Sequence, residues 1–445
     1  MGKNNIEKFS LGYALVKAVT GFWHNNFFYR KIIVLGLENI NPGDHLIFAP
    51  NHQNALMDAL AVLFTHKGQP VFLARADIFK KKLIASILYF LKILPVYRIR
   101  DGFSSLKGND EIFLKTIDVI RNKSGLVILP EGDHAGFRRL RQLKKGICRV
   151  AFQSEEATNF SLNIKIIPIG IEFSDYIKFR EVLTVAYGKP IEVSEYYDIY
   201  RDSPEKALNE LRERISREIK KMMINIESQE DYEAINELRN IVNNRFTDDS
   251  RQPRLQKDKL LIENINKLKE SGSSTYEKIC ILAVDVKRRS GELKTGYANL
   301  DSRLSLFMMA AGVAGLIITL PVFLYGAIFN LIFAGIPTMQ SRKIKDPQFR
   351  SSISYGISAA MAILLTPLIL ILSLVLIKPL WLGLLIFFSF SVAALFSWRW
   401  SELYSKLMES FRIRMYRRKH NIEFSILRRN HKKLLNLVDS IMDEK

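Results

Sequence analysis

Two apolar blocks in the last third of the chain set the strongest limit on how it can fold. Residues 304–337 contain no charged side chain, and residues 353–396 contain a single one, Lys378, which is followed by Pro379. A helix needs ~20 apolar residues to cross a lipid bilayer. The second block is therefore long enough for two crossings with a turn at Lys378. The first block fits either one tilted helix or a tight hairpin bent at Pro321, because proline interrupts helical hydrogen bonding.

A surplus of positive charge limits the classes of partner that such a chain is expected to bind. The net charge is +20, which suits nucleic acid, an anionic membrane surface or polyanionic substrates. The sequence has no zinc-finger spacing and no RNA-binding signature. Basic residues are frequent in residues 398–445, directly after the last apolar block, where anionic lipids attract them. We therefore expect membrane lipids, and no nucleic acid, as partners.

Between residues 31 and 227, short apolar runs alternate with helical patterns. The runs HLIFAPN, GLVILPEG and NIKIIPIGIEF are typical of strands, and the segment Asn54–Lys67 is typical of a helix. This alternation predicts an α/β fold with a mostly parallel sheet flanked by helices. Residues that carry out chemistry are then expected on loops that leave the strand ends.

The other segments differ from this α/β region in their patterns. We expect an amphipathic helix in residues 1–30, a helical linker region in 228–303, a transmembrane helical region in 304–397 and a basic cytoplasmic tail in 398–445. The N-terminal helix carries an apolar stripe that includes Leu15. It either packs on the core of the α/β domain or lies in the membrane interface.

The first motif whose residues could carry out a reaction is PNHQNALMD, at Pro50–Asp58. It places His52 at the end of a predicted strand and a carboxylate one or two helical turns later. His52 can take the proton of a hydroxyl group that attacks an acyl thioester. Asp58 can fix the imidazole tautomer and stabilise the imidazolium. Taken alone, a histidine near an aspartate is more often structural than catalytic.

Two further motifs lie at predicted strand exits. In LPVYRIRDG, the planar guanidinium of Arg98 suits a phosphate group, although an ordinary surface salt bridge is the alternative. In ILPEGDHAG, Glu131 can accept a hydrogen bond from an acceptor hydroxyl or hold an arginine. Gly132 lets a ligand approach the backbone closely. The alternative for this second motif is a plain strand followed by a turn.

A basic patch and a strand with a proline complete the set of motifs. The patch RRLRQLKKG includes Arg138, Arg139 and Lys145, and it suits the phosphates of a coenzyme A donor or of an anionic lipid. A solvated charged face is its alternative. In IIPIGIEF, Pro168 indicates an edge strand or a functional bend, with a simple core strand as the alternative.

In this order, the motifs resemble those of the lysophosphatidate and glycerol-phosphate acyltransferase superfamily (PlsC-like), over roughly residues 27–215. The resemblance implies that His52 and Asp58 are the catalytic pair. It also implies that Arg98, Glu131 and Gly132 bind the phosphate and glycerol of the acceptor, and it assigns Pro168 to the family's fourth motif.

The chain departs from the family pattern in two places. Five residues separate His52 from Asp58, where the family usually has four. This gap resembles fungal glycerol-phosphate and dihydroxyacetone-phosphate acyltransferases, which also carry extra membrane segments. After Gly132, the chain has Asp-His where the family usually has Thr or Ser followed by Arg. Arg138 or Arg139 is therefore a candidate to replace the missing arginine.

The resemblance predicts a membrane O-acyltransferase of phospholipid biosynthesis. The acyl donor is expected to be acyl-CoA or acyl-carrier-protein, used as a co-substrate, and the acceptor to be 1-acylglycerol-3-phosphate. Glycerol 3-phosphate and dihydroxyacetone phosphate are alternative acceptors, and a non-catalytic membrane lipid-binding scaffold is the alternative of another class. Neither the scattered histidines nor the two cysteines, Cys148 and Cys280, have metal-ligand spacing, so no bound cofactor or metal is expected.

Charge also predicts the topology in the membrane. The N-terminal segment has no convincing signal peptide, so we expect the catalytic domain on the cytoplasmic face. The loop 338–352 and the segment after residue 398 are rich in Lys and Arg, and short basic loops stay on the cytoplasmic side. Both apolar blocks would then enter the membrane and return, the first as a hairpin bent at Pro321.

Overall fold

The computed structural model describes residues 5–96, 108–243, 254–297, 300 and 304–443. The chain divides into two compact units, each made of two stretches of sequence. The first unit comprises Met1–Met223 and Pro337–Ile363, and the second comprises Ile224–Ile336 and Leu364–Lys445. The domain boundaries predicted from the sequence remain a prediction.

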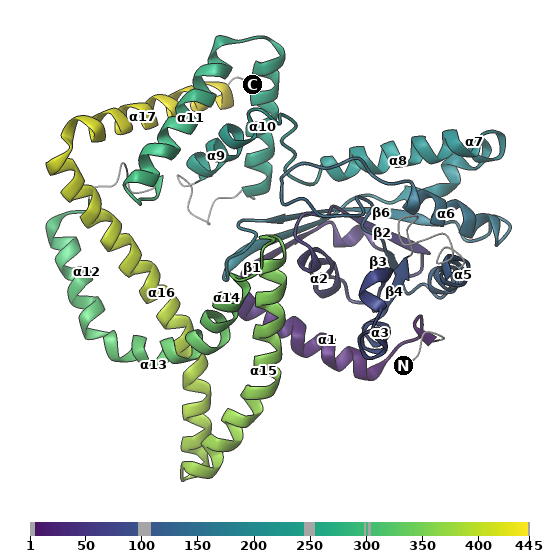
Figure 1. Ribbon diagram of the computed structural model, residues 1–445, viewed down its shortest axis with the longest axis horizontal. Helices are drawn as coiled ribbons and strands as arrows, with labels where there is room; N and C mark the ends of the chain where they lie inside the picture. The colour runs from purple at the N-terminus through teal and green to yellow at the C-terminus, as the bar shows by residue number, and fades with distance from the viewer. Residues whose placement is uncertain (1–4, 97–107, 244–253, 298–299, 301–303, 444–445) are drawn as a thin grey trace. The chain divides into compact units, whose positions relative to one another are not determined.

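A single sheet forms the centre of the first unit. Its spatial order is β1-β7-β6-β2-β5-β3-β4, with β8 paired to β6. All neighbouring pairs are parallel except β6 with β7 and β6 with β8. The predicted mostly parallel α/β fold is therefore confirmed (Figure 1). The strands are β1 (Tyr29–Leu35), β2 (Leu46–Pro50), β3 (Val71–Arg75), β4 (Ile93–Val96), β5 (Leu126–Val127), β6 (Lys165–Phe173), β7 (Glu181–Tyr187) and β8 (Ile191–Glu192).

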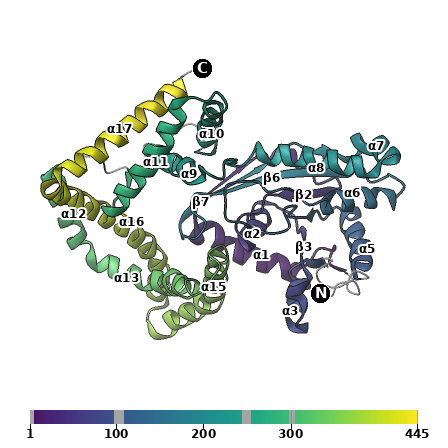
Figure 2. The same cartoon turned by 45° about the horizontal axis from the view of Figure 1, so that its top comes forward.

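Helices cover both faces of this sheet, with α8 on one side and α2 on the other (Figures 1 and 2). The helices of the first unit are α1 (Leu11–Trp23), α2 (Leu56–Thr65), α3 (Lys82–Phe90), α5 (Gly108–Arg121), α6 (Gly146–Glu156), α7 (Tyr197–Asp202) and α8 (Pro204–Lys220). Shorter helical turns are η2 (His24–Phe28), η3 (Leu37–Asn39), η4 (Ala76–Phe79) and η6 (Val193–Tyr196).

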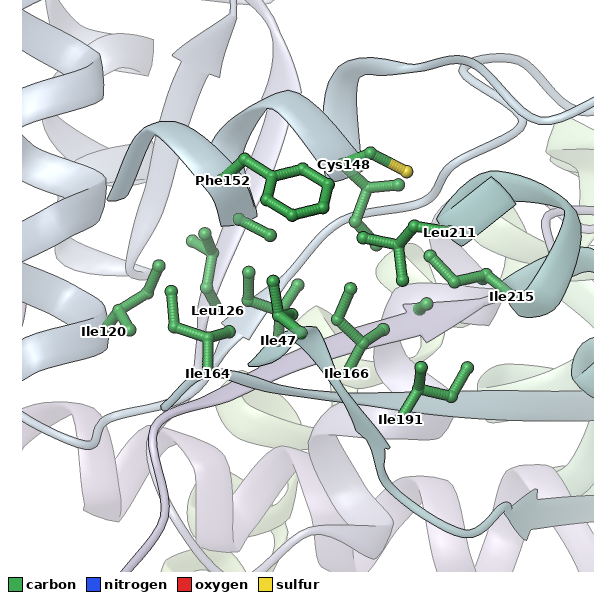
Figure 3. Close-up of a cluster of buried hydrophobic side chains, with 14 of the residues drawn as sticks. Ile47, Ile120, Leu126, Cys148, Phe152, Ile164, Ile166, Ile191, Leu211 and Ile215 are labelled. Carbon is green, nitrogen blue, oxygen red and sulfur yellow. The ribbon is translucent and has the colours of Figure 1, made fainter. Parts of the chain in front are cut away.

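The core of the first unit lies between the sheet and the helices α5, α6 and α8. Figure 3 shows Phe152 of α6 and Leu211 of α8 above Ile47 and Ile166 of the central strands. All four side chains are buried. β2 is apolar at every position, and β6 is apolar except at Lys165 and Glu172, so both strands tolerate burial on both faces, as parallel strands require.

Pro168 lies on an interior strand, so of the alternatives left open by the sequence the edge strand is wrong. It pairs with Ala49 of β2 on one side. On the other side, β7 pairs with β6 from Ile169 onward, and β8 pairs with Lys165 and Ile166. Pro168 therefore falls between these two ladders, where its missing N–H breaks no ladder bond.

Helix α1 uses its two faces differently. Tyr13 and Trp23 are buried in the first unit, whereas Leu11, Leu15 and Phe22 are each more than 60% exposed. One face therefore packs on the domain, as the first alternative predicted. The outward face is apolar, which the interfacial alternative requires, and its contact with a membrane remains a prediction.

A segment that follows the first apolar block also belongs to the first unit. It comprises most of α14 (Ile336–Ser341) and the first part of α15 (Phe349–Leu376). Trp23 Nε1 donates to Ser358 Oγ at 2.9 Å, and Tyr355 OH donates to the carbonyl of Thr20 at 3.0 Å. The start of α15 is therefore held against the α/β domain.

The second unit is helical in its described part. Its helices are α9 (Tyr232–Asn243), α10 (Arg254–Glu270), α11 (Ser274–Glu292), α12 (Leu306–Ile318), α13 (Leu320–Asn330), η8 (Leu331–Gly335), α16 (Leu380–Lys419) and α17 (Asn421–Asp443), together with the remainder of α15. Helices α9, α10, α11 and α17 share one hydrophobic core. A buried ion pair joins Arg239 and Asp258, with Nη1 and Oδ2 3.0 Å apart.

Three apolar helical stretches of the described chain are long enough to cross a membrane: Leu320–Ser341, Phe349–Leu376 and Leu380–Lys419. The last two are separated by a break at 377–379, around Lys378, where the sequence predicted a turn. The first apolar block is interrupted between α12 and α13 at Thr319, two residues before Pro321. That block is therefore not one continuous helix.

Candidate active site

The loop between β2 and α2 contains both predicted catalytic residues. β2 ends at Pro50, and Asn51 and His52 follow it directly. Asp58 lies in the first turn of α2. His52 Nδ1 and Asp58 Oδ2 are 2.8 Å apart, with Asp58 fully buried and 16% of the His52 side chain exposed. The sequence therefore brings these two residues into direct contact.

Asp58 holds the loop as well as the imidazole ring. Its Oδ2 atom also accepts hydrogen bonds from the backbone N–H groups of Gln53 and Asn54, at 2.8 and 2.7 Å. Because a carboxylate only accepts hydrogen bonds, His52 donates from Nδ1. Its Nε2 atom is then the unprotonated ring nitrogen, which can accept a proton.

The additional residue between His52 and Asp58 is accommodated by an unusual backbone conformation. Ala55 has φ 46° and ψ −125° immediately before α2 begins. Residues other than glycine seldom adopt positive φ, and such positions cost on the order of 1–3 kcal/mol. The loop thus absorbs the longer spacing, and the contact between the imidazole and the carboxylate is kept.

Three buried amide side chains hold the rest of this loop, and the sequence analysis did not assign them a role. Asn51 exchanges two hydrogen bonds with the backbone of Ile171 on β6, at 2.6 and 3.1 Å. Gln53 Oε1 accepts from Tyr176 OH at 2.6 Å, and Asn54 Nδ2 donates to the carbonyl of Tyr176 at 3.1 Å. The available signal was the cluster of Asn and Gln around His52, because buried amides need partners.

Glu131 joins two loops at the carboxyl ends of β2 and β5. Its Oε1 atom accepts from the His52 N–H at 2.6 Å, and its Oε2 atom accepts from the Arg141 N–H at 3.0 Å. Burial raises the pKa of the Glu131 carboxyl above its ordinary value, although these two N–H groups oppose the shift. In this structure Glu131 therefore holds the backbone of His52, and its predicted contact with an acceptor remains a prediction.

The other predicted acceptor residues are placed differently. Arg98 lies outside the described residues. Gly132 is exposed and has φ 71°, a conformation that glycine adopts without strain. A Cβ atom there would meet only the Lys144 side chain, at 3.4 Å. The backbone at Gly132 is consequently open to a ligand.

The basic patch contains side chains in three different environments. Arg138 is buried: its Nη2 donates to the carbonyl of Phe173 at 2.7 Å, its Nε lies 3.6 Å from Glu172 Oε2, and its guanidinium lies over the ring of Tyr176. Lys145 forms an ion pair with Glu205 at the surface. The guanidinium of Arg139 is half-buried and has no hydrogen bond or ion pair to any described residue.

A second histidine, which the sequence analysis did not select, lies beside His52. The ring centroids of His52 and His134 are 5.5 Å apart. His134 Nε2 is 3.6 Å from Asp346 Oδ2, and its ring meets the ring of Phe349 edge to face at 4.7 Å. The departure from the family pattern after Gly132 was the signal that could have identified His134.

No group of three or more His, Cys, Asp or Glu side chains suited to a metal ion occurs among the described residues. An imidazole with a free Nε2, fixed by a buried carboxylate, is an arrangement that can remove a proton from a hydroxyl group.

Part of the chain matches a known protein family. Residues 31–172 match the family model described as Acyltransferase. These residues form an acyltransferase-family domain. The resemblance inferred from the four motifs is thus confirmed for this part of the chain, which includes His52, Asp58, Glu131 and Pro168.

Two individual proteins are similar to parts of this chain. Glycerol-3-phosphate O-acyltransferase 2 of Saccharomyces cerevisiae is 28% identical over 109 residues, which are 24% of this chain and 14% of the yeast protein. The crystal structure of the 1-acyl-sn-glycerophosphate (LPA) acyltransferase PlsC from Thermotoga maritima shares 17% identity, with a TM-score of 0.35. That match covers 47% of this chain and 77% of the bacterial one.

Proposed function

We propose that this protein is a membrane O-acyltransferase that transfers a fatty acyl group from an acyl thioester to a hydroxyl group of a glycerol-phosphate acceptor. The contact between His52 and Asp58 is the observation that carries the proposal. It lies in an acyltransferase-family domain, at the end of β2, where parallel α/β folds place their active sites. The His52 side chain is 16% exposed, and Nε2 is its ring nitrogen that remains for a substrate.

In the proposed reaction, His52 Nε2 takes the proton of the acceptor hydroxyl as its oxygen attacks the thioester carbonyl. Asp58 keeps Nδ1 protonated and stabilises the imidazolium that forms. The C–S bond then breaks, and the imidazolium returns its proton to the departing thiolate. One ester bond forms and one thioester bond breaks, with no covalent acyl-enzyme.

We assign acceptor binding to Arg98, Gly132 and Arg139. Gly132 offers an open backbone, and the guanidinium of Arg139 is not committed to another described residue. Arg138 is a weaker candidate, because its guanidinium already binds Glu172 and Phe173. Glu131 supports the acceptor site through its bond to the His52 N–H. Lys145, on the same patch, is assigned to the donor's phosphates.

The donor is proposed to be acyl-CoA or acyl-carrier-protein, and the preferred acceptor 1-acylglycerol-3-phosphate. Glycerol 3-phosphate is the second candidate acceptor. It is favoured by the similarity to a yeast protein named for that substrate and by the five-residue gap between His52 and Asp58. Dihydroxyacetone phosphate is the third candidate acceptor and is included in the same assay.

We further propose that the α/β domain and the loop 338–352 lie on the cytoplasmic face. The loop shares the first unit with the α/β domain, which supports a common side for both. Three apolar stretches of membrane-crossing length support membrane integration. A cysteine at Ser440, tested with an impermeant thiol reagent on intact cells, places the C-terminal helix relative to the membrane.

The proposal is tested by assaying the purified full-length protein with a long-chain acyl-CoA and each of the three acceptors. His52→Ala should lower kcat by ~10²–10⁴-fold, the usual contribution of a positioned general base. His420→Ala, which changes an exposed histidine in the second unit, is the control and should keep the parent activity. Transfer by the His52→Ala variant at the parent rate would refute the mechanism. Absence of transfer to all three acceptors by the parent would favour the lipid-binding scaffold.

A further inference from the structure

The segment that leads into the second apolar block reaches the loop that carries His52. Ser351, in the first turn of α15, donates a hydrogen bond from Oγ to Asn54 Oδ1 at 2.8 Å. Both side chains are buried. We propose that Ser351 is a positioning residue of the acyltransferase site, through which α15 fixes the geometry of the His52–Asp58 pair. This inference rests on the proposed function.

A continuous set of hydrogen bonds connects Ser351 to the imidazole ring. Ser351 holds the side chain of Asn54, and the backbone N–H of Asn54 donates to Asp58 Oδ2 at 2.7 Å. The same Oδ2 atom accepts from His52 Nδ1 at 2.8 Å. Each contact in this series is short, and the two made by Asn54 are buried, so a displacement of Asn54 is passed to the carboxylate that orients His52.

The position of Asn54 also explains why the loop needs an external support. Asn54 immediately precedes Ala55, whose positive φ is sterically unfavourable for an alanine. A strained conformation persists only where surrounding contacts hold it. The Asn54 amide supplies such contacts on both sides, because its Nδ2 binds the carbonyl of Tyr176 while its Oδ1 binds Ser351.

The same segment meets the site at a second point. Asp346 Oδ2 lies 3.6 Å from His134 Nε2, and the ring of Phe349 packs edge to face against His134. His134 in turn lies beside His52. The residues from Asp346 to Ser351 therefore border the site on two sides, although about 300 positions separate them from His52 in the sequence. This dual contact argues for positioning and against an isolated surface bond.

The chain provides a matched control for the Ser351 hydroxyl. Ser352 is the next residue on α15 and is also buried, but its Oγ atom has no hydrogen-bond partner among the described residues. Alanine at either position removes one buried hydroxyl from the same helical turn. The two variants therefore differ in one respect that matters here, the bond to Asn54.

The experiment measures kcat, KM and the pH profile of kcat/KM for the full-length parent, Ser351→Ala and Ser352→Ala. The probes are a long-chain acyl-CoA and whichever of the three acceptors the parent uses fastest. We expect Ser351→Ala to lower kcat about tenfold, the loss that corresponds to one buried hydrogen bond, with little change in either KM. Ser352→Ala should match the parent.

The pH profile separates positioning from a general loss of stability. The titratable groups around His52 are Asp58, Glu131 and His134. A looser contact with Asp58 stabilises the imidazolium less, so the acid limb of the Ser351→Ala profile should move to lower pH. A merely less stable protein would contain less active enzyme and keep the parent profile.

A double variant provides the second readout. The double variant Ser351→Ala with Asn54→Ala should lose no more kcat than Asn54→Ala alone. Ser351 acts through its bond to Asn54, and Asn54→Ala already removes that bond. Additive losses would overturn the inference, and so would equal kcat and pH profiles for Ser351→Ala and Ser352→Ala. If His52→Ala is as active as the parent, the proposed function fails instead, so the two failures are distinguishable.

Discussion

The two loops that form the site use their polar side chains in opposite ways. The loop from Pro50 to Asp58 directs most of its amide groups and one carboxylate oxygen to partners inside the loop, on β6 and on α15, and leaves His52 Nε2 available. Gln53 Nε2 and Asp58 Oδ1 are buried without a partner among the described residues. The loop from Ile128 to Gly146 carries far more charge. It attaches itself to the rest of the domain through two of these charged side chains, Glu131 and Arg138.

This difference shows that a charged run in a sequence does not locate the charge that meets a substrate. Arg138 and Arg139 are neighbours in the basic patch, but one is buried against Glu172 and the other is uncommitted among the described residues. In the first loop, by contrast, the two residues with predicted chemistry are in contact. The following variants test this contrast, beginning with the largest expected effect.

Asp58→Asn tests whether the first loop exists to orient His52. Asparagine keeps the shape of the side chain but can present an N–H group to Nδ1, which favours the wrong tautomer. We expect kcat to fall by ~10²–10⁴-fold, as when the carboxylate of a catalytic triad is changed to an amide. Steady-state kinetics with folded protein measures this. A fall in kcat of less than tenfold would mean that Asp58 has only a structural role.

Arg138→Ala compared with Lys145→Ala tests the division within the second loop. Removing one partner of a buried ion pair leaves the other uncompensated, so Arg138→Ala should lower the free energy of unfolding by about 3 kcal/mol. Lys145 pairs with Glu205 at the surface, and its removal should leave stability unchanged. Denaturant unfolding of both variants measures the difference. Equal stability would contradict the assignment of Arg138 as a structural cation.

Glu131→Gln tests the bond between the two loops. Each oxygen of Glu131 accepts a hydrogen bond from one backbone N–H group, of His52 or of Arg141. In glutamine an NH2 group replaces one of these oxygens and cannot accept, so one of the two N–H groups loses its partner. We expect kcat to fall about tenfold, the equivalent of one buried hydrogen bond. An unchanged kcat would indicate that the second loop does not position His52.

The same variant has a predictable pH dependence of stability. The pKa of Glu131 is raised in the folded protein, so the folded state binds a proton that the unfolded chain has released above about pH 4.5. The contribution of Glu131 to the free energy of unfolding of the parent should therefore fall as the pH rises from that value. Glu131→Gln lacks this contribution. The stability difference, parent minus variant, should thus shrink between pH 4.5 and pH 8.

Ala55→Gly gives the smallest expected effect. Glycine adopts positive φ without steric cost, so the variant should relieve strain, partly offset by the greater freedom of glycine in the unfolded chain. A gain of ~1 kcal/mol in the free energy of unfolding is expected, with kcat unchanged. Denaturant unfolding checks the gain. A loss of stability would show that Ala55 is not strained.

Much of the fold follows from local sequence patterns. The apolar runs that end at Pro50 and Phe173 are the strands β2 and β6, and their alternation with helical patterns predicted the mostly parallel α/β fold. The carboxyl ends of β2 and β5 bring His52 and Glu131 together, as the rule for active sites in such sheets requires. The His52–Asp58 contact was also predictable, because both residues lie in one short loop.

Contacts between distant residues could not be predicted in this way. Arg138 meets Glu172, and Ser351 meets Asn54, through tertiary packing that leaves no period or spacing in the sequence. The place of Pro168 on an interior strand depends on where β7 and β8 end, which the strand itself does not encode. The conformation of Ala55 likewise follows from the need to join β2 to α2.

The discontinuity of the first unit has a consequence for how the protein is made. A ribosome that has completed Met223 must still synthesise 128 residues before Ser351 exists. At 5–20 residues per second this takes roughly 6–26 s. The first apolar block is translated within that interval. The nascent chain therefore contains a nearly complete acyltransferase domain that acquires its last support only after its first hydrophobic segment has emerged, so maturation of the site is coupled in time to the synthesis of the membrane region.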